Sequence, residues 1–299
     1  MTKGPSRRKR LRTARLTMRK RSAKVGLALV VFVLAVAIYG ATLDPWPPRT
    51  FPCAGICDTL PPFASLAHPF GTFPPGSDVF SEIAHGAPVD LLLGFGATGI
   101  ALVVGMLVGV LAGYRRGIVH DLLLSFIQIV LLLPSFVIVV WYYGANGDTN
   151  LFLDAQATTT LMLILGAFSW PPVALVVRNA VMTLREEEFI ESARALGSRG
   201  WRTLYRHVMP NVVAPMLSVV GIVFAVNITA EALFVFLGLV PSLEHQLLVT
   251  SWGFLLWQGA NLLPGYWWVS FFPGLMLVAT ILGFSLVADA VSDAFNPQL

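Results

Sequence analysis

The sequence predicts an all-α membrane protein with six transmembrane helices. Hydrophobic residues make up 56% of the 299-residue chain and charged residues only 12%, whereas a soluble domain is about 25% charged. Six apolar runs each reach about 20 residues, which as a helix is enough to cross a hydrocarbon core of about 30 Å. A helix also pairs its backbone groups internally, as lipid requires. The predicted spans are residues 25–43, 89–113, 120–143, 158–180, 212–238 and 267–290.

The positive charges predict that both termini lie in the cytoplasm. Residues 1–24 hold eleven of the twenty Lys and Arg side chains, and eight more lie in or beside the two loops predicted to be internal. Arg49 alone falls in a loop predicted to be external, so the positive-inside rule gives an N-in, C-in orientation. The basic cytoplasmic tail, residues 1–24, would orient the first span and contact anionic lipid. Its composition also allows nucleic-acid binding as an alternative.

The first span, residues 25–43, is interpreted as a retained anchor and not as a cleaved signal peptide. The basic region before it is long, the apolar run fills a whole span, and five more spans follow. An external Pro-rich loop at 44–88 comes next and contains Cys53 and Cys57. A disulfide between them is predicted for an oxidising compartment, with two free thiols or half a metal site as alternatives. Residues 77–88 are predicted to form a short amphipathic helix at the surface.

The other five spans form a core at residues 89–293, and residues 294–299 are a cytoplasmic C-terminus. Gly105, Gly109 and Gly113 recur every four residues, so span two presents a small face that another helix can approach closely. Prolines interrupt or begin spans three to six and predict kinks: Pro134, Pro171–Pro172, Pro215 and Pro273. The external segment 242–266 is too apolar for a free loop, so we expect it to fold back onto the membrane. Its aromatic residues fit a belt at the outer interface: Trp252, Trp257, Tyr266, Trp267 and Trp268.

Several absences argue against catalysis by this chain. A phosphate-binding loop of the G-x-x-x-x-G-K-[ST] type needs a Lys, and no Lys follows Lys24. No His falls in the interior of a predicted span, since His120 stands at the inner face where the third span begins, and no cluster of His, Cys, Asp and Glu has metal-ligand spacing. We therefore expect a protein that is not an enzyme and that binds no cofactor or metal itself.

Glu231 is the clearest ionisable residue within a span, and it is a functional candidate for that reason. Asn227 precedes it by one helical turn, so the two side chains share a face. Together they are candidates for lining a polar pathway or for closing its outer end. A protonated or paired structural Glu near the interface is the alternative interpretation.

The internal segment 184–210 is predicted to hold two short helices. Three Glu residues suit the first turn of the first helix, since they complement its dipole, and Gly197 can end it. Apolar residues on one side would suit a helix lying flat on the membrane surface. The small residues between Ser192 and Gly197 favour instead a helix inserted into the groove of a protein, because they permit close approach.

The stretch EFIESARALGSRGWRTLYRHVMPN resembles the EAA motif of ABC importer permeases, in the form used by the dipeptide/oligopeptide class. Other matches follow in order along the chain: GSDVFSEIAHGAP, EALFVFLGL, SWGFLLWQG, YWWVSFFPG and ADAVSDAFNP. They resemble the C-type of the two permeases of this class. The chain departs from the family pattern by having Ser77, Ser285, Ala288 and Ser292 in place of Arg, Asn, Gly and Arg.

The resemblance implies a type I ABC importer permease fold, in which the EAA helix couples the membrane helices to a cytoplasmic ATPase. It implies a homologous second permease subunit, two ATPase subunits or one two-domain ATPase, and an extracellular solute-binding protein. ATP and Mg would be bound by the ATPase, and the complex would lie in the plasma or inner membrane. The residues assigned to coupling are Glu188, Glu191, Ser192, Ala193, Arg194, Ala195, Leu196, Gly197 and Pro210.

The function implied by the resemblance is import of dipeptides, oligopeptides or solutes of similar size. Oligosaccharides and nickel complexes are alternative cargoes for the same machinery. Two alternatives come from other functional classes: a proton-coupled secondary transporter that uses Glu231, and a membrane scaffold without a pathway. The first predicts uptake without ATP, and the second predicts no ATPase stimulation by solute.

Overall fold

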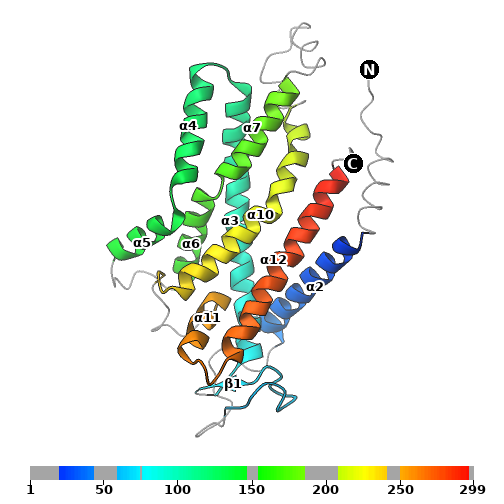
Figure 1. Cartoon of the computed structure of the whole chain (residues 1–299), viewed down its shortest axis with the longest axis vertical. Coiled ribbons are helices and arrows are strands. Elements are labelled where there is room, and N and C mark those ends of the chain that lie inside the picture. Colours follow the sequence, from blue (N-terminus) through cyan, green and yellow to red (C-terminus); the bar gives the residue numbers. More distant parts are fainter. Residues whose placement is uncertain are drawn as a thin grey trace.

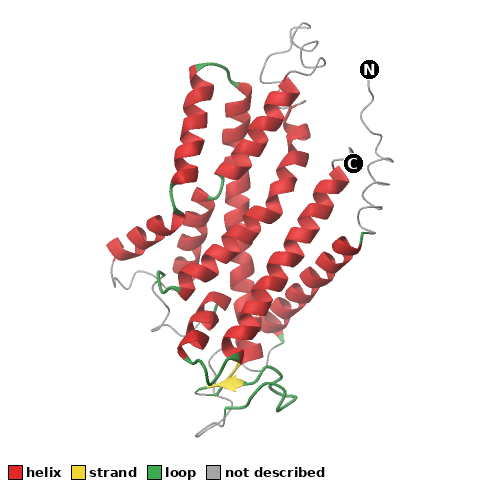
Figure 2. Ribbon diagram, viewed as in Figure 1, coloured by secondary structure: helices red, strands yellow, loops and turns green. Residues whose placement is uncertain are grey.

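The apolar runs form long helices that lie side by side in one bundle (Figures 1 and 2). The computed structural model describes residues 20–43, 59–74, 76–146, 154–185, 208–240 and 250–295. Strands β1 and β2 form a small antiparallel pair, with Thr72 opposite Asp78. In chain order, the elements are α2 (Arg21–Thr42), β1 (Thr72–Phe73), β2 (Ser77–Asp78), α3 (Val79–Tyr114), α4 (Ile118–Leu132), α5 (Ser135–Asn146), α6 (Asp154–Phe168), α7 (Pro171–Arg185), α10 (Met209–Phe236), α11 (Trp252–Asn261) and α12 (Trp268–Phe295).

Among the described residues, five helical segments are long and apolar enough to cross a membrane. They are α2, α3, the joined α6 and α7, α10 and α12. A sixth is obtained when the bent pair α4 and α5 is counted as one span. The predicted class of an all-α protein with several transmembrane helices is therefore confirmed.

The third predicted span, residues 120–143, is broken at Pro134. Helices α4 and α5 meet there at a bend of 68°. Proline has no N–H to donate to the preceding turn, and α4 already ends with Leu133 N–H bonded to the carbonyls of Ile129 and Val130 at 3.2 Å. The predicted kink at Pro134 is confirmed, but it divides the segment into two separate helices.

Residues 77–88 do not form the separate surface helix that the sequence predicts. They make the two-residue strand β2 and the first turns of the 36-residue helix α3, which continues through Pro88. Asp78 begins this helix, since its carboxylate accepts the Ser81 N–H at 2.8 Å. Ile83 is fully buried in a cluster with α2, α10, α11 and α12. The polar face of this stretch is covered by other parts of the chain, so it does not lie on the surface.

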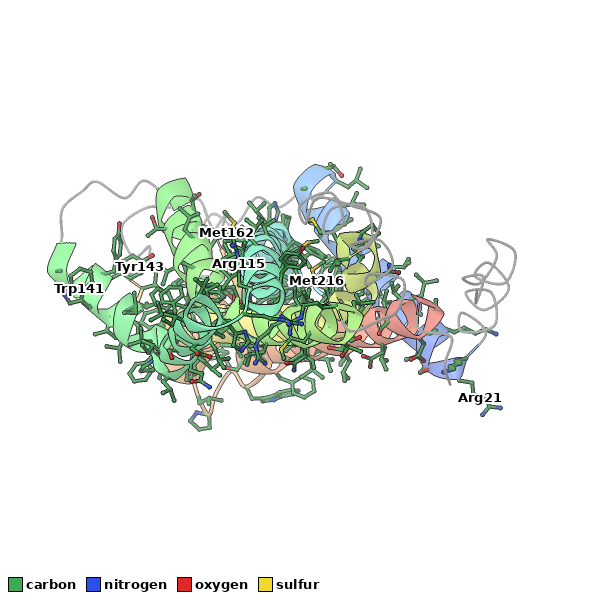
Figure 3. All side chains as sticks on the ribbon, turned by 90° about the horizontal axis from the view of Figure 1, so that it is seen from above. Arg21, Arg115, Trp141, Tyr143, Met162 and Met216 are labelled. Carbon is green, nitrogen blue, oxygen red and sulfur yellow. The ribbon has the colours of Figure 1, made fainter. Side chains whose placement is uncertain are left out.

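The two ends of the bundle differ in charge. One end carries the start of α2, the end of α12 and the α3–α4 turn with Arg115 and Arg116 (Figure 1). Figure 3 looks down on this end and shows Arg115 near the middle of the bundle and Arg21 at its edge. We call it the arginine end. The opposite end carries the β1–β2 pair and α11, and we call it the hairpin end.

Helix α3 is central to the packing. It contacts α7, α6, α10 and α2 along its length, and α11 near its start. Toward the arginine end, α3 presents Gly105, Gly109 and Gly113 to α7, where they lie against Val173, Val177 and Val181 in turn. The predicted close-packed face of this helix is confirmed.

Candidate functional site

The predicted coupling segment leaves and re-enters the bundle at the arginine end. Helix α7 ends at Arg185 and α10 begins at Met209, with Pro210 in its first turn, where a missing N–H costs no helical bond. The other predicted coupling residues lie outside the described part of the chain: Glu188, Glu191, Ser192, Ala193, Arg194, Ala195, Leu196 and Gly197. Cys53 and Cys57 also lie outside it, so the disulfide stays a prediction.

The end of α7 is tied to the α3–α4 turn by side-chain hydrogen bonds. Arg178 Nη2 lies 3.1 Å from His120 Nε2, and His120 Nδ1 lies 2.6 Å from the Ala112 carbonyl oxygen. A guanidinium can only donate, so Nε2 accepts and the Nδ1–H donates to the carbonyl, which makes His120 a neutral imidazole in this arrangement. Arg185 adds bonds of 3.3 Å to the carbonyls of Gly113 and Arg115. The start of the coupling segment is thus held on α3.

The packing of α3 on α7 leaves no space between the two backbones. A Cβ at Gly109 would lie 2.5 Å from the Ala174 carbonyl oxygen and 2.8 Å from Val177 Cβ. Gly105 and Gly113 are equally close to α7. Backbone contact of this kind fixes two helices against each other through dispersion. At this end of the bundle α7 and α3 are therefore packed directly against each other.

Asn227 and Glu231 share a face of α10, as predicted, and this face lies against α3. Both side chains are almost fully buried, at 1% and 2% exposed. Asn227 Nδ2 donates to the Thr98 hydroxyl at 3.3 Å, and Glu231 contacts the side chains of Asp90 and Ser251. The structure therefore places them in the packed interior between α3, α10 and the start of α11. Their role in a pathway or gate stays a prediction.

Two further acids at the hairpin end were not identified from the sequence. Asp90 is fully buried, and its Oδ2 accepts the Trp252 N–H at 3.0 Å. Glu82 is also buried, and its Oε2 accepts the Thr250 hydroxyl at 2.7 Å. We call Glu82, Asp90 and Glu231 the acidic cluster. All three carboxyl groups meet the residues that lead into α11.

The Trp252 side chain does not belong to the predicted aromatic belt. It is fully buried, and its indole N–H donates to the Ile83 carbonyl at 3.0 Å. Trp268 is also buried and donates to the Thr72 carbonyl at 3.1 Å. Trp267 is exposed, as expected of a belt residue. In the described part of segment 242–266, α11 packs against α12, α10 and α3, and the return of this segment onto the membrane stays a prediction.

An apolar groove runs along the side of α10. It has a volume of about 740 Å³ and is lined by the α4–α5 bend and by successive turns of α10. Pro134 and Phe136 form one wall, and Ile222, Val226 and Leu233 form the other. Asn227 and Glu231 are not among its lining residues. Across the described ranges, no group of three His, Cys, Asp or Glu side chains could hold a metal ion.

Comparison with known proteins gives one family and several similar relatives. Residues 105–299 match the family described as "Binding-protein-dependent transport system inner membrane component". A putative peptide transport system permease protein of Brucella suis is 29% identical over 287 residues, covering 96% of this chain and 91% of the relative. The dipeptide transport system permease protein DppC of Alkalihalophilus pseudofirmus is 28% identical, covering 93% and 86%. The oligopeptide transport system permease protein OppC of Bacillus subtilis is 27% identical, with the same coverages of 93% and 86%.

Proposed function

Because the chain belongs to the family of binding-protein-dependent transport system inner membrane components, we propose that it is a permease subunit of an ATP-driven importer of dipeptides or oligopeptides. The observation that carries the peptide assignment is similarity over more than nine tenths of the chain to permeases named for peptide transport. Solutes of similar size, such as oligosaccharides or nickel complexes, are the alternative cargoes.

The apolar groove beside α10 is a candidate for one half of the translocation pathway. It is concave, lies on a membrane-spanning helix and is bounded by the bend at Pro134. A homologous second permease subunit would supply the other half. An apolar lining, with hydroxyl groups at Ser135 and Thr229, would give few strong contacts and would therefore pass peptides of different sequence.

Coupling to ATP hydrolysis is assigned to the segment between α7 and α10. We infer that its EAA helix inserts into a groove of a cytoplasmic ATPase subunit, with Glu191 in contact with that subunit. ATP and Mg belong to the ATPase, which is present as two subunits or as one two-domain protein. This assignment is supported by the close packing of α7 on α3, because a rigid contact can transmit movement of the segment to the membrane helices.

The distribution of positive charge predicts the orientation of the chain in the membrane. The arginine end would face the cytoplasm, in keeping with the positive-inside rule, and the hairpin end would face outward. An extracellular solute-binding protein would then deliver solute near α11 and the β1–β2 pair. Cysteines placed one at a time at Gly117 or Gly265, in a variant with Cys53 and Cys57 replaced by Ser, test this orientation with a membrane-impermeant thiol reagent, since only the second should react in intact cells.

Replacement of Glu191 tests the coupling role. The variant Glu191→Ala should insert normally and should lose ATP-dependent peptide uptake together with co-purification of the ATPase. Glu186→Ala removes the same charge outside the motif and serves as the matched control. The proposal would be contradicted if Glu191→Ala took up peptide at the wild-type rate. It would also be contradicted if the wild-type permease took up peptide without the ATPase.

The cargo is identified through the solute-binding protein that co-purifies with the intact complex. Mass spectrometry of its bound ligand should detect peptides. Recovery of oligosaccharides or nickel complexes instead would retain the importer assignment and reject the peptide assignment.

A further inference from the structure

The link between α11 and the bundle depends on two carboxyl groups that touch each other. Asp90 on α3 and Glu231 on α10 lie within hydrogen-bonding contact, and both are buried. Asp90 also accepts the first N–H of α11, from Trp252, and Glu231 contacts Ser251, which caps that helix by accepting the Phe254 N–H at 3.3 Å. The pair therefore joins three helices at the hairpin end.

Two ionised carboxylates cannot form this contact favourably. Each would offer only acceptors, so no hydrogen bond could join them, and two like charges in contact inside an apolar bundle repel each other strongly. No protein donor in the described ranges reaches Asp90 Oδ1 or Glu231 Oε2. A single proton would remove one charge and would provide the missing donor.

The charged neighbours do not offer another way to neutralise the pair. The acid Glu82, two turns earlier on α3, accepts the Thr250 hydroxyl, and His85 lies 2.9 Å from the Ser81 carbonyl. Helix α11 carries no charged residue. The other charged side chains described on the neighbouring helices α2, α7 and α12 belong to the arginine end. Arg21 and Lys24 lie in the first turn of α2, and Asp289 and Asp293 lie in the last two turns of α12. Arg178 and Arg185 of α7 bond residues of the α3–α4 turn and its flanks.

We propose that Asp90 and Glu231 hold one proton between them and that this shared proton keeps the first turn of α11 attached to α3 and α10. Loss of the proton leaves two adjacent negative charges beside the start of α11. Their repulsion separates α3 from α10 at this point and weakens the contacts of Asp90 with Trp252 and of Glu231 with Ser251. The attachment of α11 at the hairpin end therefore depends on pH, independently of the ATPase at the other end.

The protonated carboxyl group can be observed directly by infrared spectroscopy of the intact transporter complex in lipid nanodiscs. The wild type should show a carbonyl stretch of a protonated carboxylic acid that Glu231→Gln and Asp90→Asn each lack at the same pH. In either variant the amide donates to the remaining carboxylate and takes the place of the proton. Asp293→Asn, at the arginine end, is the matched control and should retain the band. A wild-type spectrum without this band would overturn the proposal.

Hydrogen exchange of the first turn of α11 tests the mechanical consequence. At acidic pH the wild type and Glu231→Gln should exchange at the same rate, because both have a donor between the two side chains. At alkaline pH the wild type should exchange at least about tenfold faster than the variant. Comparison of the same peptide at each pH removes the intrinsic pH dependence of exchange. Equal rates at every pH would overturn the proposal.

A bound cation is distinguished from a proton by the same measurement. If Na⁺ at fixed alkaline pH protected the first turn of α11 in the wild type, the pair would be a cation site and the proton assignment would be wrong. Should Glu231→Gln fail to fold, Asp90→Asn provides the same comparison. None of these outcomes depends on peptide uptake, so failure here is separable from failure of the importer assignment.

Discussion

The two halves of α3 pack in opposite ways. Toward the arginine end, Gly105, Gly109 and Gly113 bring its backbone directly against the valines of α7, and side-chain hydrogen bonds are added at the last turn, where Arg185 donates to the Gly113 carbonyl. Toward the hairpin end, Glu82 and Asp90 bury carboxyl groups that bind the residues leading into α11. The first contact depends on closeness and the second on hydrogen bonds.

This difference predicts which kind of change each half tolerates. A dry contact between small residues fails when volume is added, since neither backbone can move away without losing dispersion contacts. A buried polar contact fails when one partner is removed, because the other is left without a hydrogen bond in a medium of low dielectric constant. The arginine-end half of α3 should be sensitive to side-chain size, and the half that holds α11 should be sensitive to polarity.

The largest effect is expected for Gly109→Val. Its Cβ would overlap the Ala174 carbonyl, so α3 and α7 must separate, at a cost of about 3 kcal/mol. Gly99→Val is the matched control in the same helix, since nothing lies within 4 Å of a Cβ at Gly99. An SDS titration in mixed micelles measures the folded fraction. Equal loss in both variants would mean that the helix cannot accept Val anywhere and that the α7 contact is not the cause.

The second-largest loss of stability is expected for Asp90→Ala. The Trp252 N–H loses its acceptor and stays buried, which costs about 2 kcal/mol. Asp289→Ala removes the same group from an exposed position of α12 and should leave stability unchanged. Thermal unfolding in detergent, together with hydrogen exchange of the α11 amides, compares the stability of the two variants. Stability of Asp90→Ala equal to the wild type would show that the carboxylate contributes nothing to the attachment of α11.

The arginine-end half of α3 could be predicted from the sequence, and the hairpin-end half could not. Gly105, Gly109 and Gly113 repeat every four residues, which is the spacing of one helix face, so a local pattern is sufficient. Pro134 likewise acts on its own turn and predicts the break between α4 and α5. In both cases the physical cause lies within a few residues of its effect.

The acidic cluster has no such local signal. Asp90 and Trp252 are 162 residues apart, and in a single sequence Asp90 looks like an interfacial residue at the start of a predicted span. Pro88 makes this misplacement of Asp90 at the interface easier, because a Pro at this position suggests that a helix starts there. In the structure the helix continues past it, and Gly40 of α2 packs against the carbonyl of Ala84, which Pro88 cannot bond.

A smaller loss of stability is expected for Trp252→Phe, which keeps a buried aromatic ring but removes the indole N–H. The variant loses the indole bond to the Ile83 carbonyl and should cost about 1 kcal/mol. Trp267→Phe is the control, since the Trp267 side chain is exposed. The shift in unfolding midpoint should be clear for the first variant and absent for the second. Equal shifts would assign the effect to ring size and not to the hydrogen bond.

The smallest effect is expected for Lys20→Ala, which removes a charge pair outside both halves of α3. Lys20 Nζ lies 2.8 Å from Asp293 Oδ2 and joins the start of α2 to the end of α12, but the two side chains are 56% and 37% exposed. Water and salt screen such a pair, so the change should stay below about 0.5 kcal/mol and should vanish at high ionic strength. The same unfolding titration, repeated with added salt, measures both quantities. A salt-independent loss as large as that of Asp90→Ala would mean that the pair is buried by a partner in the complex, and polarity would then matter at both ends of the bundle.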